Sequence, residues 1–391
     1  MMLTRPGSLV ALVCALAAWP GATVPPSAVL NTAPLATGGP LVFALSDVTL
    51  PAAPRLIHAH DADGDGDLEI TVLGSSFGQL LGQISTLEND GNGTFTLGWT
   101  SPHPADVDAL SPMWLDLADV DLDGDLDASI TPSGNDHTVR LNDGDGELDM
   151  FRTGHWFGGY AGPGAFGDVT GDGLPDLAHF TDDFGGSYID IGEGLGDGAF
   201  PGWSFWTDNP RDGRTLIRFA DVTETGVLTP ILSTQSGIYQ PPPSGFTWDN
   251  IVSGAFRGHE VIDLDGDTHL DIVFAEPAAD RLGVVLGNGD GTWSAASWFN
   301  TGREPDQIVV ADMDGDGVLD VVTGNVDQGS ISILLGDGAG GFGPKQDIPT
   351  GPGPLGLTAG DFDLDGDTDL AVADAGATTV TILLQQTGGA R

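Results

Sequence analysis

Short runs of alternating apolar and polar residues recur along most of the chain, separated by turns rich in glycine and aspartate. In one clear unit the run Gln307–Ala311 precedes an acidic turn that starts at Asp312, and runs at 319–322 and 330–335 follow. A glycine-rich turn then leads to a fourth run that opens on Phe342. Period-two alternation between glycine turns is typical of antiparallel strands, so the unit predicts a four-stranded sheet.

The acidic turn occurs seven times at a spacing of about fifty residues. The turns start at Asp61, Asp119, Asp168, Asp221, Asp263, Asp312 and Asp361. Six aromatic residues open fourth runs: Phe95, Phe151, Phe200, Phe246, Trp293 and Phe342. Four-stranded units repeated at this spacing are typical of the blades of a β-propeller. We therefore predict an all-β fold, a seven-bladed β-propeller of four-stranded antiparallel blades, over residues 41–391.

The last unit lacks a fourth run, because the chain ends soon after the third run at 379–384. The missing run is found at the other end of the repeats, where Phe43–Pro51 mirrors the fourth run Phe342–Pro349. We predict that an N-terminal strand at about 41–50 completes the last blade and closes the ring. Closure would remove the exposed sheet edges that favour aggregation. No second domain is indicated.

Residues 1–22 have the pattern of a secretory signal peptide. Arg5 supplies the positive start, a short apolar run follows at 8–19, and small residues offer cleavage points up to Ala22. Residues 23–40, rich in proline, alanine, threonine and glycine, predict a flexible lead-in. No apolar run is long enough to span a membrane. The expected location is secreted or at the cell surface, and the exported chain would lack the single cysteine, Cys14.

The charge of the chain limits its partners. Aspartate and glutamate total 57 against 12 lysines and arginines, a net charge of −45. Such a surface repels nucleic acid and anionic membranes, so neither is an expected partner. A hydrophobic content of 40% and the strand periodicity favour a folded chain over a disordered one.

The acidic turns carry the spacing of a cation site. In the clearest turn, oxygen-bearing side chains fall at positions 1, 3, 5 and 9 (Asp312, Asp314, Asp316 and Asp320), and a glycine falls at position 6. Calcium takes six to eight oxygen ligands in flexible geometry, whereas magnesium requires a tighter octahedron and zinc prefers histidine and cysteine. An EF-hand is excluded, because position 12 carries no glutamate and no amphipathic helix flanks the turns. We predict structural calcium, without a catalytic role.

Five turns carry the full ligand set and a sixth carries most of it. The complete sets are Asp61/Asp63/Asp65/Glu69, Asp119/Asp121/Asp123/Asp127, Asp263/Asp265/Asp267/Asp271, Asp312/Asp314/Asp316/Asp320 and Asp361/Asp363/Asp365/Asp369. The third turn, Asp168/Thr170/Asp172/Asp176, has fewer charges, and Thr268 replaces glycine in the fifth. The fourth turn, Asp221–Thr229, has lost most of its ligands and is expected to bind nothing. Five to six calcium ions are predicted.

The turn Asp312–Val322 and its copies resemble the FG-GAP or VCBS repeat. This repeat forms the seven-bladed propeller of integrin α-chain heads and of many bacterial exported proteins. The resemblance extends over nearly all of residues 41–391, and it implies the propeller fold and calcium in the turns. It leaves function open, because the family includes adhesion proteins, lectins and appendages of enzymes.

Two surfaces could receive a partner. The first is the central channel, which the residue three positions before each turn is expected to face: His58, Asp116, Ala165, Arg218, Glu260, Val309 and Thr358. The second is the face opposite the acidic turns, where arginines and aromatic residues share loops. We predict a ligand face with Arg55, Arg211, Arg214, Arg257 and Arg303, beside Trp99, Trp156, Tyr160, Trp203, Trp206 and Trp298.

The leading hypothesis is a monomeric adhesion or recognition module for an extracellular glycan or protein. The chain shows no convincing catalytic motif, so no enzyme is expected. The alternatives are a polysaccharide lyase or hydrolase acting in the channel, around His58, Asp116, Arg218 and Glu260, or a purely structural surface protein.

Overall fold

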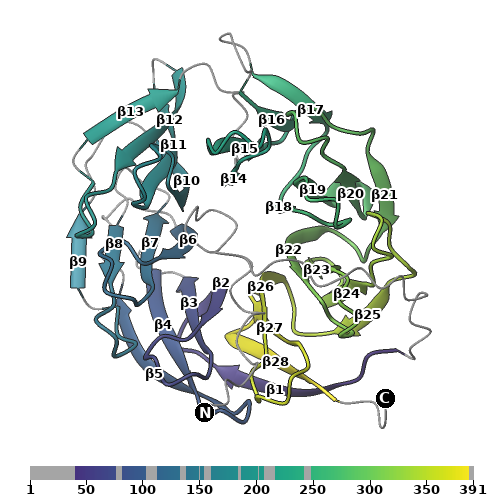
Figure 1. The fold of residues 1–391 in the computed structure, drawn as a ribbon. Coiled ribbons are helices and arrows are strands. Elements are labelled where there is room, and N and C mark those ends of the chain that lie inside the picture. Colours follow the sequence, from purple (N-terminus) through teal and green to yellow (C-terminus); the bar gives the residue numbers. More distant parts are fainter. Residues whose placement is uncertain are drawn as a thin grey trace, which may run out of the picture.

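Seven four-stranded antiparallel sheets form a closed ring (Figure 1). The computed structural model describes residues 40–75, 82–102, 112–132, 138–148, 150–153, 160–183, 186–200, 202–206, 216–241 and 248–386. The predicted signal peptide at 1–22 and most of the lead-in therefore lie outside the described residues. Within them, the fold is all-β with seven blades, as the repeat predicted, and its one helical element is the short 3-10 turn η1 (Pro277–Ala279).

Blades 1 to 6 each consist of four consecutive strands, numbered outward from the centre of the ring. Blade 1 contains β2 (Ala53–His60), β3 (Glu69–Ser75), β4 (Gly82–Asn89) and β5 (Phe95–Pro102). Blade 2 contains β6 (Pro112–Ala118), β7 (Asp127–Pro132), β8 (Thr138–Leu141) and β9 (Met150–Thr153). Blade 3 contains β10 (Tyr160–Gly167), β11 (Asp176–Asp183), β12 (Gly186–Glu193) and β13 (Gly202–Trp206). Blade 4 contains β14 (Leu216–Ala220), β15 (Thr229–Ser233), β16 (Gly237–Gln240) and β17 (Asp249–Ser253). Blade 5 contains β18 (His259–Ile262), β19 (Asp271–Glu276), β20 (Arg281–Val285) and β21 (Ser297–Asn300). Blade 6 contains β22 (Pro305–Ala311), β23 (Asp320–Asn325), β24 (Ser330–Leu334) and β25 (Gln346–Pro349).

Blade 7 joins the two ends of the repeat. It combines β26 (Pro354–Gly360), β27 (Asp369–Asp374) and β28 (Thr379–Gln385) with β1 (Phe43–Thr49), which pairs antiparallel with β28 from Phe43↔Gln385 to Thr49↔Thr379. Figure 1 shows the purple β1 alongside the yellow β28 at the outer edge of the ring. The predicted closure by an N-terminal strand is confirmed.

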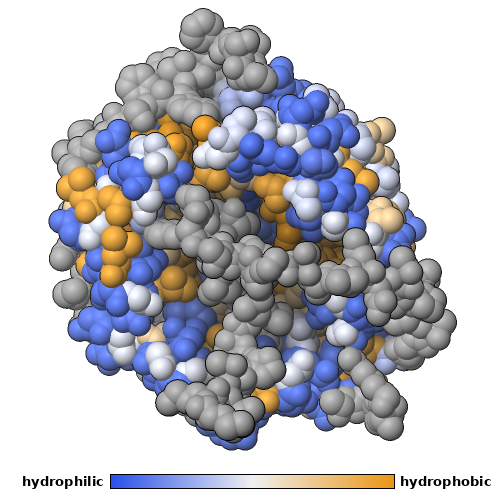
Figure 2. Space-filling model, viewed as in Figure 1, coloured by the Kyte–Doolittle hydropathy of each residue, from blue (hydrophilic) through white to orange (hydrophobic). Residues whose placement is uncertain are grey.

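The hydrophobic core lies between the blades. All six residues of β23 and all six of β27 are buried, because each blade packs a neighbour on both faces. Ile57 and Ile70 of blade 1 share one cluster with Phe362 and Ala373 of blade 7, and similar clusters lie between other neighbours. Hydrophilic residues cover much of the ring face in Figure 2, with apolar residues in smaller groups.

Some fourth strands begin later than the aromatic residues predicted. Phe95 opens β5, but Trp293 and Phe342 lie in isolated bridges to Gly287 and Gly336, ahead of β21 and β25. Phe246 lies outside the described residues. No helix in the described part of the chain is long and apolar enough to span a membrane.

The acidic turns need left-handed backbone at two positions, not one. Position 6 has positive φ in every turn, including Thr268 at 81°, and so does position 4, where blades 2 and 7 carry Leu122 and Leu364. A left-handed conformation costs a residue with a side chain about 1–2 kcal/mol, a cost that glycine does not incur. The fifth turn therefore holds strain at Thr268 that the other turns lack at position 6.

Replacing Thr268 by glycine is expected to raise the free energy of unfolding by about 1 kcal/mol, since relief of the left-handed strain outweighs the extra entropy of the unfolded chain. Gly317→Thr at the equivalent position of blade 6 is the reverse control, and a Cβ there meets no atom within 4 Å, so its expected cost is purely backbone strain. Denaturant unfolding in calcium measures both. Destabilisation by Thr268→Gly would contradict this account.

Candidate metal sites and ligand face

The first aspartate of each turn organises its backbone. In blade 6, Asp312 Oδ1 accepts the N–H groups of Gly315 at 2.7 Å and Asp316 at 3.1 Å, and Oδ2 accepts that of Gly317 at 2.9 Å. Corresponding bonds are made by Asp61, Asp119, Asp168, Asp221, Asp263 and Asp361. A short side chain that accepts amides ahead of it stabilises a tight turn, so position 1 shapes the loop independently of any ion.

Three carboxylates converge in the turns of blades 1, 2, 5 and 6. Each of the following groups offers oxygens that lie within 4.8 Å of one another: Asp61/Asp63/Glu69, Asp65/Asp67/Glu69, Asp119/Asp121/Asp123, Asp263/Asp265/Asp271 and Asp312/Asp314/Asp316. Two oxygens bound to one calcium ion at 2.3–2.6 Å lie at most about 5 Å apart, so the donor sets fit that ion. Asp67 was not predicted as a ligand. The sequence signal that could have identified it is an acid at position 7 of the turn.

Several predicted ligands lie outside these five groups, and three of them, Thr170, Asp267 and Asp365, contact the turn backbone. In blade 5, Asp267 Oδ1 accepts the N–H two residues ahead of it at 2.8 Å, and in blade 7, Asp365 Oδ1 does the same at 2.9 Å. In blade 3, Thr170 carries a hydroxyl in place of a carboxylate, and its N–H donates to Asp176 Oδ2 at 2.8 Å. The spacing does not reveal these backbone bonds. The role of Thr170, Asp267 and Asp365 as ligands stays a prediction.

Three buried oxygens in the described turns have no hydrogen-bond partner. They are Oδ1 of Asp67 at position 7 in blade 1, Oδ1 of Asp121 at position 3 in blade 2 and Oδ1 of Asp363 at position 3 in blade 7. A buried carboxylate oxygen without a donor is costly, and a bound cation would remove that cost. Together with the spacing of the oxygens, this supports a cation at the turns.

The position 9 carboxylate is a buried junction as well as a candidate ligand. Asp320, 1% exposed, accepts Met313 N–H at Oδ2 and Gly336 N–H at Oδ1, both at 2.7 Å, and so joins the turn to the end of β24. The same arrangement holds for Asp127, Asp176, Asp271 and Asp369. The sequence predicted only a ligand here, because spacing does not distinguish a metal ligand from a backbone acceptor.

Two turns depart from the full pattern. In blade 3, Asp168 accepts three turn amides and Asp176 is fully buried, so the backbone is preserved with fewer acids. In blade 4, Asp221 still accepts the N–H groups of Thr225 and Gly226, although the other predicted ligand positions lack acids. Glu224 there pairs with His269 of the next blade's turn. The fourth turn thus keeps its shape through hydrogen bonds and an ion pair.

Neighbouring blades hold the turns in place, which the sequence analysis missed. Asn142 Nδ2 of blade 2 donates to Ala62 O in the first turn at 2.7 Å, and Asn89 Nδ2 of blade 1 donates to Phe362 O in the seventh turn at 2.9 Å. Both asparagines begin Asn-Asp-Gly loops between third and fourth strands. An asparagine at that point in the repeat is a usable sequence signal.

Burial raises the pKa of the position 9 carboxyls of blades 1, 2, 5, 6 and 7, and nearby turn acids raise it further. The pKa is about 8 for Glu69 and about 7 for Asp127, Asp320 and Asp369. Folding without calcium thus favours protonated carboxyls, and this stabilisation is lost as the pH rises through those values. Below pH 6.5 the effect is opposed by His58, His60 and His259, whose pKa values burial lowers to about 4, 4 and 3.

In chelator, the protein is therefore expected to be more stable at pH 6.5 than at pH 8, by roughly 1–3 kcal/mol. Calcium keeps the carboxylates ionised, so in millimolar calcium the difference should shrink or reverse. Thermal unfolding at both pH values, with calcium or chelator, measures this. Greater stability at pH 8 in chelator would show that the buried carboxyls do not govern this range.

The polar channel residues contact the next blade, instead of only lining an open channel. His58 Nε2 lies 3.2 Å from Leu115 O, Asp116 Oδ2 accepts Phe166 N–H at 2.8 Å, and Thr358 Oγ1 accepts Ala59 N–H at 3.1 Å. These contacts cross from blade 1 to 2, 2 to 3 and 7 to 1.

The other members of the predicted channel set either contact a neighbouring blade or are buried. Arg218 donates to both carboxylate oxygens of Glu260 in blade 5, at 2.8 and 3.2 Å, and its guanidinium lies 5.1 Å from the ring of Trp114 in blade 2. Ala165 and Val309 are buried in the packing between blades, so their predicted exposure to the channel was wrong. Burial raises the pKa of Asp116 to about 6.

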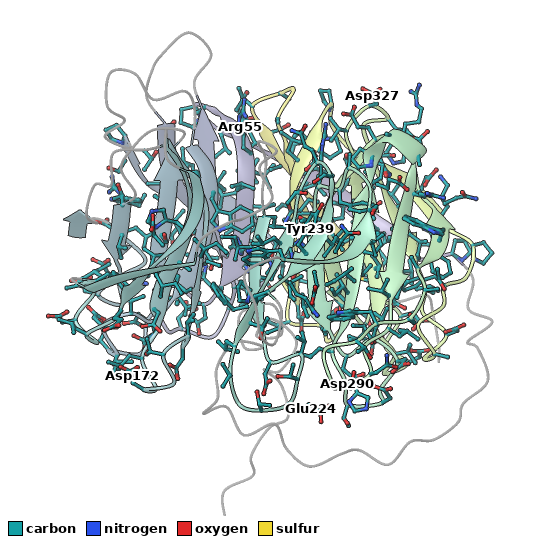
Figure 3. The ribbon with its side chains drawn as sticks, turned by 90° about the horizontal axis from the view of Figure 1, so that it is seen from above. Arg55, Asp172, Glu224, Tyr239, Asp290 and Asp327 are labelled. Carbon is teal, nitrogen blue, oxygen red and sulfur yellow. The ribbon has the colours of Figure 1, made fainter. Side chains whose placement is uncertain are left out.

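The acidic turns and the predicted ligand face lie at opposite ends of the ring. Figure 3 shows Asp172, Glu224 and Asp290 on one side and Arg55 and Asp327 on the other. Arg211 and Arg214 lie outside the described residues, as do the side chains of Trp156, Tyr160, Trp203 and Trp206.

Arg257 and Arg303 lie between strands on the predicted ligand face. Arg257 is held by Glu304 at 3.0 Å and Asp306 at 2.5 Å; burial opposes its charge, but these carboxylates raise its pKa. Arg303 is exposed, with one 3.4 Å contact from its guanidinium to Asp327 O. The two arginines belong to one surface cavity of about 670 Å³.

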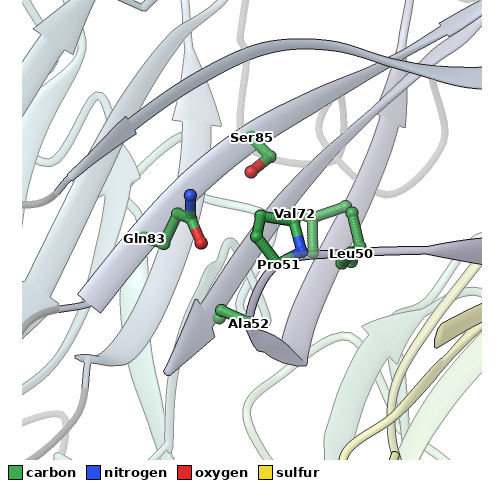
Figure 4. A pocket seen from close by; sticks show the side chains of 7 residues that line it. Leu50, Pro51, Ala52, Val72, Gln83 and Ser85 are labelled. Carbon is green, nitrogen blue, oxygen red and sulfur yellow. The ribbon is translucent and has the colours of Figure 1, made fainter. Parts of the chain in front are cut away.

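The two predicted tryptophans whose side chains are described pack against the blades. Trp99 joins a cluster between blades 1 and 2, with Arg140 over its ring at 6.0 Å. Trp298 packs on Phe256 and Phe274. A separate cavity, lined by Leu50, Pro51, Ala52, Val72, Gly74, Gln83 and Ser85, has a volume of about 10 Å³ (Figure 4). It is no larger than one water requires.

Comparison with known proteins identifies the repeat. The model of the FG-GAP-like repeat matches residues 61–130, 263–323 and 320–372, which include the turns of blades 1, 2, 5, 6 and 7. A search of the curated proteins found no match.

Two solved structures share the fold. One is an Agrocybe aegerita lectin whose structure describes recognition of non-reducing terminal N-acetylglucosamine; it has a TM-score of 0.52 and 21% identity, over 86% of each chain. The other is BBS1N in complex with ARL6DN, with a TM-score of 0.56 and 10% identity, over 89% of this chain and 98% of that one. At these identities the likeness shows the fold alone.

Proposed function

Because the chain is a seven-bladed β-propeller built on FG-GAP-like repeats, we propose that it is an exported, calcium-stabilised recognition module. It binds an extracellular glycan or protein through the face opposite the acidic turns. Export is proposed from the signal-type pattern of residues 1–22, and calcium from the turns.

The observation that carries the proposal is the division of the ring into two chemically different ends. One end gathers converging carboxylates that fit calcium and that accept hydrogen bonds from the turn backbone, and an asparagine of the adjoining blade bonds to the first turn. The other end presents Arg257, Arg303 and a cavity of about 670 Å³, a volume within the usual range of ligand sites. Calcium then stabilises the ring at the end with the acidic turns, and the loops at the other end can vary in sequence for recognition.

The lectin with the same fold supports this proposal only as a precedent that such a ring can carry a glycan site. The residues for such a site in this chain come from its own cavity.

We propose binding without catalysis. The channel residues of the rival enzyme hypothesis are engaged with neighbouring blades: Asp116 accepts Phe166 N–H, and Arg218 is fixed by Glu260. A lyase or hydrolase needs an acid or base placed toward substrate, whereas these groups hold the ring together. Release of products from pectin or alginate would favour the enzyme instead.

The test is an array of neutral and acidic glycans and purified extracellular proteins, probed with the intact protein in 1 mM calcium (about the extracellular level) and in chelator. Calcium-dependent binding to one ligand class is the expected result. An intact fold in calcium that binds no arrayed ligand would contradict the proposal and favour a purely structural surface role.

A further inference from the structure

One cavity on the ligand face combines several features that are typical of a binding site. It is formed by loops of blades 4, 5 and 6, with a volume of about 670 Å³, and is lined by Gln235, Ala255, Phe256, Arg257, Pro277, Ala278, Asp280, Arg303, Glu304 and Asp327. The loops lie between β15 and β16, β17 and β18, β19 and β20, β21 and β22, and β23 and β24. Figure 3 places Asp327 at the end of the ring away from the acidic turns.

Among the described residues outside the acidic turns, left-handed backbone at residues other than glycine is found only at this cavity. Six described residues other than glycine have positive φ, and four of them, Leu122, Glu224, Thr268 and Leu364, belong to the acidic turns. The remaining two, Asp280 at 54° and Glu304 at 56°, both line the cavity. Strain of this kind persists where the surroundings enforce it, and it gathers at ligand sites.

Hydrogen bonds fix the two strained residues to each other and to an arginine. Asp280 Oδ1 accepts Glu304 N–H at 2.9 Å, and Glu304 Oε1 accepts from Arg257 at 3.0 Å. Asp306 holds the other end of the same guanidinium. The wall formed by Asp280, Glu304 and Arg257 is therefore preorganised, which lowers the entropy cost of binding.

The charge and chemistry of the lining favour an uncharged ligand rich in hydroxyl groups. Two arginines face three carboxylates, so the lining carries a formal charge of −1 on a chain of −45. An acidic ligand would meet those carboxylates, and a basic one would meet Arg257 and Arg303. A hydroxyl donates to a carboxylate and accepts from a guanidinium, and Gln235 can do both. Ala255, Pro277 and Ala278 add an apolar surface suited to the C–H face of a sugar ring.

We propose that this cavity is a binding site for the end of an uncharged glycan. The inference rests on the proposed recognition function and specifies its site and ligand class. Arg303 and Asp327 are the best residues for a test, because both are exposed and their side chains make few contacts within the fold.

The experiment compares wild type with Arg303→Ala/Asp327→Ala on an array of immobilised neutral and acidic oligosaccharides in calcium. Asp290→Ala is the matched control, since it removes an exposed aspartate at the opposite end of the ring (Figure 3). We expect the double variant to lose at least about tenfold in affinity for a neutral glycan, whereas Asp290→Ala should bind as wild type does, and the melting temperature of both variants should be unchanged.

The outcomes separate the two proposals. Neutral-glycan binding that the double variant leaves unchanged would overturn the cavity assignment and leave the recognition function standing. Binding of acidic glycans alone would overturn the ligand class. If the folded wild type binds no glycan, the inference fails, and the recognition function then rests on protein ligands alone.

Discussion

A chain without residues 41–50 is expected to unfold or aggregate at temperatures where the intact chain is a folded ring. The deletion removes β1, which contributes seven register pairs with β28, and Leu50, which is buried between blades 7 and 1. At about 0.5–1.5 kcal/mol for one hydrogen bond per pair, the loss is roughly 4–10 kcal/mol, similar to a domain's net stability of about 5–15 kcal/mol. The deletion also exposes the edge of β28, a template for association.

Rescue by a peptide distinguishes loss of this strand from general damage. A synthetic peptide of residues 41–50 should restore a monomeric, cooperatively unfolding protein, while a scrambled peptide should not. Within the full chain, Val48→Asp, at a side chain packed on the core, should destabilise more than Leu45→Asp, at a side chain that is 51% exposed. A truncated chain that stays monomeric with an unchanged melting temperature would refute closure by β1.

Replacing the buried Asp320 by alanine should lower the free energy of unfolding by about as much as the loss of many surface contacts. Asp320→Ala removes the acceptor of two buried N–H groups, those of Met313 and Gly336. Each unsatisfied buried donor costs about 1–3 kcal/mol, so the expected loss of unfolding free energy is about 2–6 kcal/mol. Because these bonds do not involve an ion, the loss should appear in chelator as well as in calcium.

Asp316→Ala in the same turn is the matched control. Asp316 is exposed and belongs to the converging set with Asp312 and Asp314. Its removal should cost less than about 1 kcal/mol in chelator, and should mainly reduce the extra stability that calcium provides. Urea unfolding of both variants, with and without calcium, separates the two roles. Equal effects of the two substitutions in chelator would show that position 9 is not a structural junction.

The repeat allowed the fold to be predicted because each blade contains the same local signals. Alternating runs and acidic turns predict four strands, and the resemblance of Phe43–Pro51 to Phe342–Pro349 predicts the closing strand. Candidate ligand positions 1, 3, 5 and 9 could be proposed for the same reason. Position 4 was not recognised as left-handed, because Leu122, Glu224 and Leu364 replace the glycine that the other four turns carry there.

The sequence pattern could not predict contacts between residues of different blades. Arg257 meets Glu304 and Asp306 across a blade boundary, so composition indicated an arginine-rich face without its counter-charges. The channel prediction treated the innermost strands as a free wall, although their spacing lets Asp116 reach Phe166 N–H of the next blade. Local periodicity gives the direction of a side chain within its sheet, whereas its partner depends on how neighbouring sheets stack.

The central claim is that calcium in the acidic turns stabilises the ring. Thermal unfolding of the intact protein tests it most directly, with separate samples in calcium at about 1 mM, in magnesium at about 1 mM and in chelator. Sites with dissociation constants near 10⁻⁴–10⁻³ M each add about 0.4–1.4 kcal/mol, and five to six of them add several kcal/mol. The account predicts a melting temperature several degrees higher in calcium than in chelator, with magnesium close to chelator. Identical melting temperatures in calcium and chelator would contradict it, because the acidic turns would then hold the ring without an ion.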